Sequence, residues 1–212
     1  MGQEYLKSKN AWRLWIFIGV NFAVFLSVSV SKQLTSSSIE HFWQRVSAKD
    51  GLATICMPLA AVVLNGFLGD LAKARLVFWR WQNPLPGCRA FSKLMGTDPR
   101  IAVKVLKTKC GRFPEDPKEQ NALWYQLYKK HTESVTVIEA HRAYLLTRDM
   151  TALSAVFAVL FSIGIFVALA SLKIVALYGA TLIAQYLILS TSARNYGTRF
   201  VLNVLTEESH AK

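Results

Sequence analysis

Four long blocks that contain no charged residue constrain this chain more than any other feature of its sequence. The blocks are Leu14–Ser31, Gly51–Gly69, Met150–Leu172 and Ile174–Ala193. Each is ~18 to 23 residues long, the length at which an α-helix crosses the hydrocarbon core of a bilayer. Soluble proteins seldom bury four uncharged helices of this length. The pattern therefore predicts an all-α integral membrane protein with four transmembrane helices.

The first block differs from a cleaved signal peptide. It is too long for the apolar region of such a peptide. We therefore expect it to remain in the protein as the first span.

Lys and Arg are unevenly distributed between the two sets of loops that flank these blocks. One set carries Lys7, Lys9, Arg13, Lys73, Arg75, Arg80, Arg89, Arg142, Arg148, Arg194 and Arg199. The opposite set carries only Lys32, Arg45, Lys49 and Lys173. Because cytoplasmic loops are enriched in Lys and Arg, we expect both termini and the loop between spans two and three in the cytoplasm. The predicted location is the bacterial inner membrane, crossed several times.

These boundaries divide the chain into four predicted parts. The N-terminal arm with spans one and two occupies residues 1–70, and a basic cytoplasmic helical segment occupies residues 71–149. The hairpin of spans three and four follows over residues 150–193, and a cytoplasmic tail over residues 194–212. The predicted architecture is thus four transmembrane helices with a helical insert between the second and third.

One long helix is predicted to join the insert to the third span. Asp116 is a suitable N-cap, Pro117 fits the first helical position, and Glu119 follows three residues after the cap. No Gly or Pro occurs from there until Gly164. We therefore expect an unbroken helix from Pro117 to about Leu172, acting as a stalk.

The remaining cytoplasmic sequence predicts shorter helices. The helix after Asp70 is expected to continue to Gln82, where Asn83-Pro84 ends it. A second short helix is expected to start at Thr97-Asp98-Pro99 and to stop at Gly111. The tail has an apolar patch at helical spacing that can pack on the cytoplasmic segment or on the membrane surface, formed by Phe200, Val201, Val204 and Leu205. A short amphipathic helix is also expected on the outer surface, over residues 39–46.

Three amide side chains are the most informative polar positions inside the predicted spans: Asn21, Asn65 and Gln185. An amide in lipid must find a hydrogen-bond partner, and a bond between helices contributes ~1 kcal/mol. We interpret these residues as contacts between helices or between subunits, and a pore lining is the alternative. Either interpretation favours a homo-oligomer.

The cytoplasmic segment is strongly basic, with fifteen Lys or Arg and seven Asp or Glu over residues 71–150. The residues predicted to contact a partner or lipid headgroups are Lys73, Arg75, Arg80, Arg89, Lys104, Lys107, Lys109 and Arg112. Anionic lipid is the favoured partner, because a basic cytoplasmic loop is what membrane topology already demands. An acidic soluble protein fits the same charge, and nucleic acid is a less favoured alternative.

Catalytic and cofactor-binding motifs do not occur in the sequence. It has no phosphate-binding loop, no GxSxG, no HExxH and no CxxC. His131, Glu139, His141 and Asp149 are the best enzyme candidates, but their spacing suits a salt-bridged surface better than a shared site. No span contains Asp, Glu, Lys, Arg or His, which argues against proton-coupled transport. We expect no enzyme activity, no cofactor and no metal.

The layout resembles the small membrane components of bacterial anti-phage systems, of which the Kiwa membrane subunits are the example. The similarity lies in four spans, a basic cytoplasmic insert between the second and third, and the absence of a catalytic motif. The resemblance implies an oligomeric membrane sensor that holds or releases a cytosolic effector. It assigns no role to any single residue.

The function predicted from these observations is that of a non-enzymatic, oligomeric inner-membrane sensor or scaffold. It would dock a soluble cytoplasmic effector, in the context of anti-phage defence. The alternative is a pore-forming effector that depolarises the membrane, lined by Asn21, Asn65 and Gln185.

Overall fold

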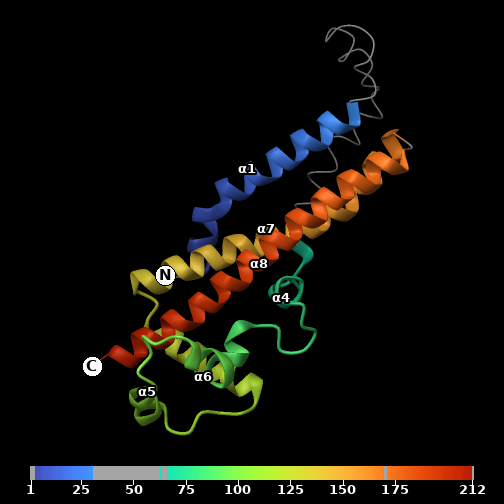
Figure 1. The fold of residues 1–212 in the computed structure, drawn as a ribbon. Helices are drawn as coiled ribbons and strands as arrows, with labels where there is room; N and C mark the ends of the chain where they lie inside the picture. The colour runs from blue at the N-terminus through green and yellow to red at the C-terminus, as the bar shows by residue number, and fades with distance from the viewer. Residues whose placement is uncertain (1–2, 31–62, 64–65, 170, 212) are drawn as a thin grey trace. The chain divides into compact units, whose positions relative to one another are not determined.

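The computed structural model describes residues 3–30, 63, 66–169 and 171–211. This part of the chain is helical and contains no strand (Figure 1). The α-helices are α1 (Gln3–Val30), α4 (Asp70–Phe78), α5 (Val103–Cys110), α6 (Pro117–Lys130), α7 (Val135–Leu169) and α8 (Leu172–His210). Three short 3₁₀ or π turns lie between α4 and α5, namely η1 (Pro86–Arg89), η2 (Ala90–Leu94) and η3 (Met95–Thr97).

Three of the described helices contain stretches long and apolar enough to cross a membrane. The stretches are Asn10–Ser29, Val135–Val167 and Leu172–His210. They support a multi-pass membrane protein, as the sequence predicted. Most of the predicted second span, including Asn65, lies outside the described residues, and so does the predicted surface helix 39–46.

The chain divides into two compact units. The first, which we call the head unit, consists of Met1–Asn10, Asp70–Arg148 and Leu189–Lys212. The second, the span unit, consists of Ala11–Gly69 and Asp149–Ile188. Both α7 and α8 belong partly to each unit. The basic segment predicted from the sequence and the C-terminal tail therefore fold in one unit.

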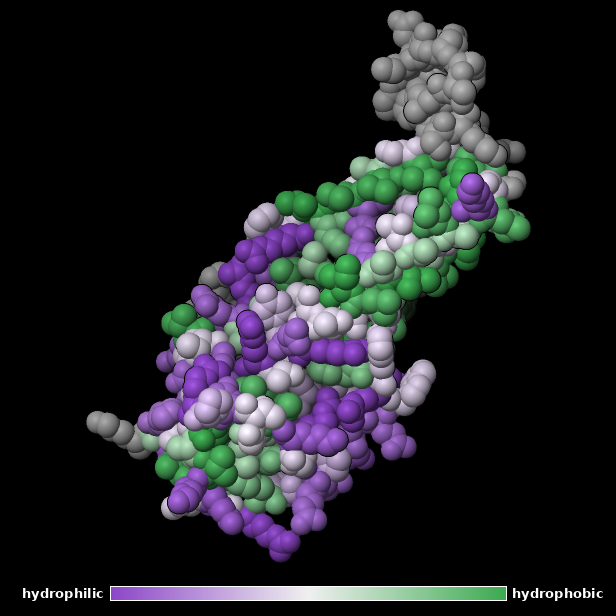
Figure 2. Space-filling model, viewed as in Figure 1, coloured by the Kyte–Doolittle hydropathy of each residue, from purple (hydrophilic) through white to green (hydrophobic). Residues whose placement is uncertain are grey.

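Aromatic side chains hold the described helices of the span unit together. Phe17 and Phe25 of α1 contact Phe157 and Phe161 of α7, with ring centroids 6.0 Å and 4.7 Å apart respectively. Phe157 and Phe161 are fully buried. Leu182 of α8 belongs to the same buried cluster. In Figure 2 the hydrophobic colour is concentrated over these three helices.

The core of the head unit forms where α6, the first turns of α7 and the end of α8 meet. Phe200 of α8 packs edge-on against Trp124 and Tyr128 of α6, at centroid distances of 5.1 Å and 5.2 Å. The rest of the predicted tail patch, Val201, Val204 and Leu205, is fully buried in this core. The patch thus packs on the segment of residues 71–149, which was one of its two predicted positions.

The predicted stalk helix from Pro117 to Leu172 is wrong, because the chain turns between Lys130 and Val135. No Gly or Pro causes this break. The break places the apolar face of α6 against Phe200. The free energy gained by burying Trp124 and Tyr128 exceeds the helix propensity of the residues in the turn, which would favour a continuous helix. Asp116 does cap α6, since its carboxylate accepts hydrogen bonds from the backbone N–H groups of Lys118 and Glu119.

Two other predicted boundaries are also wrong. Helix α4 ends at Phe78 rather than Gln82, because Trp79 adopts a left-handed backbone conformation, with φ +53°. Helix α5 starts at Val103 rather than Pro99, because the Asp98 carboxylate accepts a bond from the Arg100 backbone N–H instead of capping α5. The predicted stop of α5 at Gly111 is confirmed, and the φ of Gly111 is +72°.

Candidate functional site

A buried histidine lies in the aromatic core of the head unit. The His141 ring stacks on Phe200 at 4.4 Å with an interplanar angle of 1°. Its Nδ1 is 3.1 Å from the Tyr128 hydroxyl, and His141 is only 3% exposed. Burial raises the pKa of Tyr128, and the neighbouring Tyr125 adds to this effect. A histidine so enclosed is a packed, hydrogen-bonded part of the core.

Two carboxylates near the end of α8 hold the turn between α6 and α7. Glu208 accepts hydrogen bonds from His131 at 2.6 Å and from Lys130 at 3.3 Å. Glu207 accepts bonds from the Thr136 and Ser134 hydroxyls at 2.6 Å and 2.9 Å. These side-chain bonds tie the turn to the end of α8 and leave both carboxylates paired.

The environment of these carboxylates favours their charged forms. Burial raises the pKa of Glu208, but the hydrogen bonds from His131 and Lys130 outweigh burial, and the pKa is lowered overall. The hydroxyls of Thr136 and Ser134 lower the pKa of Glu207. Both side chains are therefore structural anions that fix the fold of the head unit at neutral pH.

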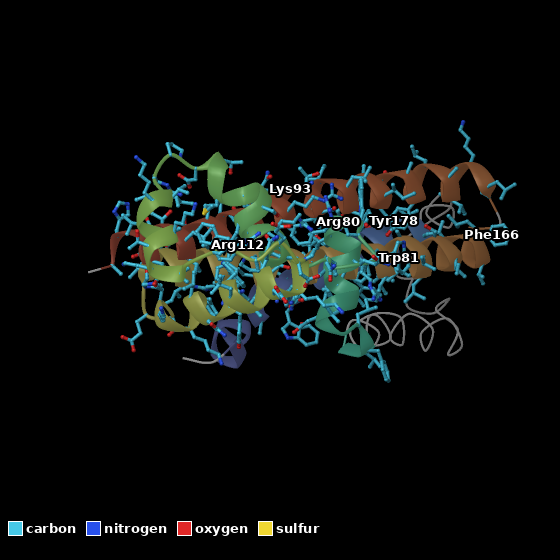
Figure 3. All side chains as sticks on the ribbon, turned by 90° about the horizontal axis from the view of Figure 1, so that it is seen from below. Arg80, Trp81, Lys93, Arg112, Phe166 and Tyr178 are labelled. Carbon is cyan, nitrogen blue, oxygen red and sulfur yellow. The ribbon has the colours of Figure 1, made fainter. Side chains whose placement is uncertain are left out.

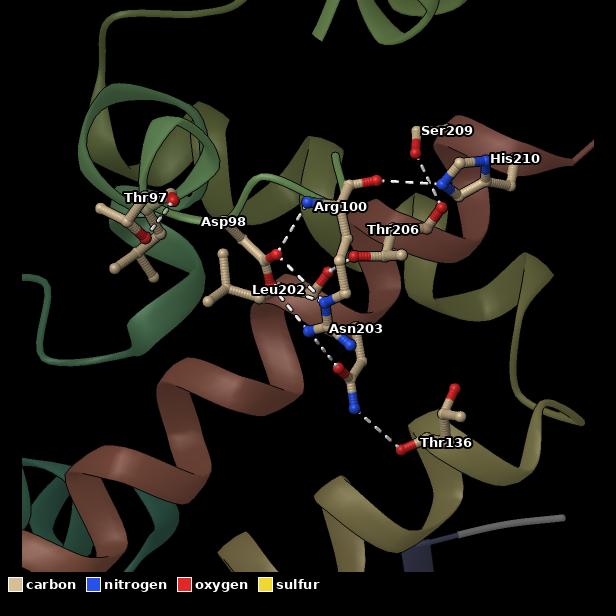
Figure 4. Close-up of polar contacts among 10 residues, drawn as sticks. Thr97, Asp98, Arg100, Thr136, Leu202, Asn203, Thr206, Ser209 and His210 are labelled. Carbon is tan, nitrogen blue, oxygen red and sulfur yellow. Dashed lines mark hydrogen bonds and ion pairs between the residues drawn. The ribbon is translucent and has the colours of Figure 1, made fainter. Parts of the chain in front are cut away.

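A second polar network attaches the loop before α5 to α8 and α7 (Figure 4). Arg100 forms an ion pair with Asp98 at 2.7 Å and also reaches Asn203 at 3.3 Å. Asn203 in turn donates to the Thr136 carbonyl at 3.1 Å, and the Arg100 carbonyl is 2.9 Å from His210 Nε2. This network positions the segment that carries α5.

The titratable residues singled out from the sequence do not form a shared site. His131 bonds to Glu208, whereas His141 bonds to Tyr128. Glu139 is exposed, and Asp149 is buried within the span unit. Within the part of the chain that the structure describes, no three His, Cys, Asp or Glu side chains come together as metal ligands would.

Helix α5 presents exposed charge and exposed apolar surface side by side. Lys104 and Lys107 are exposed on successive turns, and neither has a described ion-pair partner. Val103 and Val105 beside them are also exposed. Leu106 faces the opposite way and is fully buried. We call Val103, Lys104, Val105 and Lys107 the α5 surface.

Most of the other predicted contact residues are buried or bond to groups of the head unit itself. Arg75, Arg89 and Lys109 each donate to a backbone carbonyl, and Arg112 forms an exposed ion pair with Glu115 at 3.3 Å. Lys73 is buried in α4, whereas Arg80 is exposed just after it. Arg80 and Arg112 are labelled in Figure 3. Of the eight predicted residues, Arg80, Lys104 and Lys107 therefore keep the charge most accessible to a partner.

The structure brings two of the three predicted amides together inside the span unit. The Gln185 amide nitrogen donates to Asn21 Oδ1 at 3.1 Å and to the Ser154 hydroxyl at 2.9 Å. Asn21 donates to the Phe17 carbonyl of its own helix at 2.9 Å. One polar contact thus connects α1, α7 and α8. The arrangement supports an adhesive role rather than a pore lining.

Sequence reasoning did not single out Glu207, Glu208 or Ser154. Glu207 and Glu208 lie within three residues of Leu205, the last residue of the apolar patch of the tail, so their position at the end of a packed helix was a usable signal. Ser154 had no comparable signal, because Ser is common in uncharged spans and its partner Gln185 lies 31 residues away.

Comparisons of this chain with protein-family models, with curated proteins and with solved structures found no match in any of the three.

Proposed function

We propose that this chain is a non-enzymatic, oligomeric membrane scaffold whose head unit docks a soluble cytoplasmic effector. The observation that carries the proposal is that the buried polar groups of the head unit bond to other parts of its own fold. His141 and Glu208 hold the core and the α6–α7 turn, while the Lys side chains of α5 face outward. Such a body is suited to binding through its surface rather than to catalysis.

The proposal includes a topology. Residues 51–69 form a fourth span, and the head unit lies in the cytoplasm of a bacterial inner membrane. The support is the excess of Lys and Arg on one set of flanks. The resemblance to membrane components of anti-phage systems adds the context, in which the scaffold senses a change at the membrane and holds or releases its effector.

The two shared helices suit a sensor. Both α7 and α8 run without interruption through residues of the span unit and of the head unit. A change in the span unit therefore has a continuous helical route to the residues that hold the α6–α7 turn. This replaces the single stalk predicted from the sequence with two helices.

The α5 surface is the docking surface in this proposal, and the partner is an acidic protein. Two Lys side chains without a described acidic partner attract negative charge, and the adjacent Val103 and Val105 supply apolar contact area.

The experiment is affinity capture of the full-length chain from detergent-solubilised membranes, with quantitative mass spectrometry of the bound proteins. We compare the wild type with Lys104→Glu/Lys107→Glu and with the control Lys118→Glu/Lys129→Glu, which changes the same charge on α6. A partner that is lost with the α5 variant and retained with the control supports the proposal. The same set of bound proteins with all three chains rejects it, and nuclease-sensitive capture assigns the surface to nucleic acid instead.

A further inference from the structure

Four arginines converge on the turn that follows α4, which we call the Trp79–Asn83 turn. Arg75 Nε donates to the Trp81 carbonyl at 3.1 Å, and Arg89 Nη1 donates to the Asn83 carbonyl at 3.4 Å. Arg194 Nε of α8 donates to the Val77 carbonyl at 2.5 Å, directly before the turn. Arg80, which is labelled in Figure 3, lies within the turn, and its side chain is exposed.

No carboxylate among the described residues bonds to any of these four arginines. Asp70, the acidic residue of α4, forms its ion pair with Arg148 at 3.0 Å. Burial and the nearby positive charge of Arg80 lower the pKa of Arg89, so the guanidinium groups repel each other. In addition, Arg194 Nη2 is buried without a hydrogen-bond partner. The turn thus gathers positive charge that lacks a described counterion.

Two tryptophans in the same turn face outward. Trp79 is 57% exposed and Trp81 is 80% exposed, although Trp is normally among the more buried residue types. Each has an arginine over its ring, Arg194 at 3.9 Å from Trp79 and Arg75 at 5.7 Å from Trp81. Both Trp79 and Asn83 have positive φ, at +53° and +49°. A non-glycine backbone in this region is held there at a cost, and such positions cluster at functional sites.

The position of the turn identifies the source of its ligand. Arg194 is the first charged residue after the uncharged stretch that ends at Ala193. Outward-facing tryptophans next to such a boundary are typical of the headgroup level of a membrane. We infer that the Trp79–Asn83 turn is a binding site for the phosphate of an anionic lipid headgroup. Arg75 and Arg80 supply the exposed positive charge, Trp79 and Trp81 enter the interface, and Arg89 and Arg194 position the turn.

The test uses the full-length chain in detergent and native mass spectrometry with added phosphatidylglycerol or phosphatidylcholine. The variant is Arg80→Gln/Trp81→Ala, which alters only exposed side chains, with Arg80→Gln as a milder second variant. The control is Lys104→Gln/Lys107→Gln on the α5 surface, which removes positive charge elsewhere in the head unit. Near-surface arginines each contribute about fivefold to the affinity for anionic lipid.

With two exposed arginines at about fivefold each, the wild type is expected to bind phosphatidylglycerol roughly 25-fold more tightly than phosphatidylcholine. This preference should fall about fivefold with Arg80→Gln, further with the double variant, and less than twofold with the control. An equal loss with the control would show that general charge is responsible and would overturn the assignment. Displacement of phosphatidylglycerol by millimolar inorganic phosphate would also overturn it, because the site would then bind free anions. The two proposals are tested separately. The lipid measurement uses no effector, and the α5 surface that would dock the effector serves in it only as the charge control.

Discussion

Polar side chains are numerous in the head unit and few in the described part of the span unit, and they meet different demands. In the head unit, Glu207, Glu208 and Arg100 bond to residues distant in sequence around an aromatic core. In the span unit, one contact between Gln185 and Asn21 joins helices whose apolar side chains remain exposed, such as Val167 at 78%. Water drives the burial of apolar surface in the head unit, whereas helices in lipid associate by packing and a few hydrogen bonds.

The largest effect is expected from Phe200→Ala in the head unit. Phe200 is 4% exposed and contacts Trp124, Tyr128 and His141, so its loss leaves a cavity. We expect the free energy of unfolding to fall by about 3–5 kcal/mol. Chemical unfolding in detergent, followed by tryptophan fluorescence, measures this change. The control Val167→Ala in the span unit should change it little, and a similar loss in both variants would remove the distinction between the units.

A smaller effect is expected from Gly87→Ala in the turn before η2. A Cβ at this position would lie 2.7 Å from Trp124 Cε3 and 2.5 Å from Asn121 Oδ1. Trp124 is packed in the core and cannot move freely, so we expect a loss of about 1–3 kcal/mol. Gly96→Ala is the matched control, because nothing lies within 4 Å of its added Cβ. Thermal unfolding of both variants measures the difference in stability. Equal stability of Gly87→Ala and Gly96→Ala would contradict this packing of η1 on α6.

The contact between Asn21 and Gln185 is expected to contribute less. A double-mutant cycle with Asn21→Leu, Gln185→Leu and the combined variant should give a coupling energy of about 0.6 kcal/mol, as for other hydrogen bonds between membrane helices. Chemical unfolding in detergent supplies the four free energies. Additive losses would show that the two amides do not interact. If the pore alternative held, the same variants would instead change ion flux through liposomes without changing stability.

The smallest effect, confined to acid solution, concerns Glu208. Its pKa in the folded protein is lowered from 4.5, so its stabilising contribution is present above that value and is lost as the pH falls through the folded pKa. Glu208→Gln should therefore flatten the decline of the thermal unfolding temperature below about pH 4.5. Glu115→Gln is the control, because Glu115 is exposed near the surface. An unchanged decline in Glu208→Gln would mean that other groups cause it.

Local signals in the sequence predicted several features of the fold correctly. Asp116 and Pro117 marked the start of α6, Gly111 marked the end of α5, and the spacing of Phe200, Val201, Val204 and Leu205 marked a packing face. In each case the residues that determine the feature are neighbours along the chain. The uncharged blocks likewise predicted helices long enough to span a membrane.

Two of the incorrect predictions, the unbroken stalk and the end of α4, involve residues that are distant in the sequence. The break after Lys130 is fixed by Glu208, which bonds to His131 across 77 residues of sequence. The early end of α4 is accompanied by contacts from Arg194, 117 residues from Val77. The pairing of Asn21 with Gln185 spans 164 residues. No local pattern encodes such pairings, so the polar sites could be named in advance but their partners could not.

The most direct test of the membrane scaffold is the location of the head unit. Green fluorescent protein or alkaline phosphatase is fused after Lys212, at the end of the chain segment that completes the head unit. In bacterial cells we expect a fluorescent fusion protein in the membrane fraction and an inactive phosphatase fusion, because we propose that the head unit lies in the cytoplasm. An active phosphatase fusion, or a chain that remains soluble and monodisperse without detergent, would contradict the account.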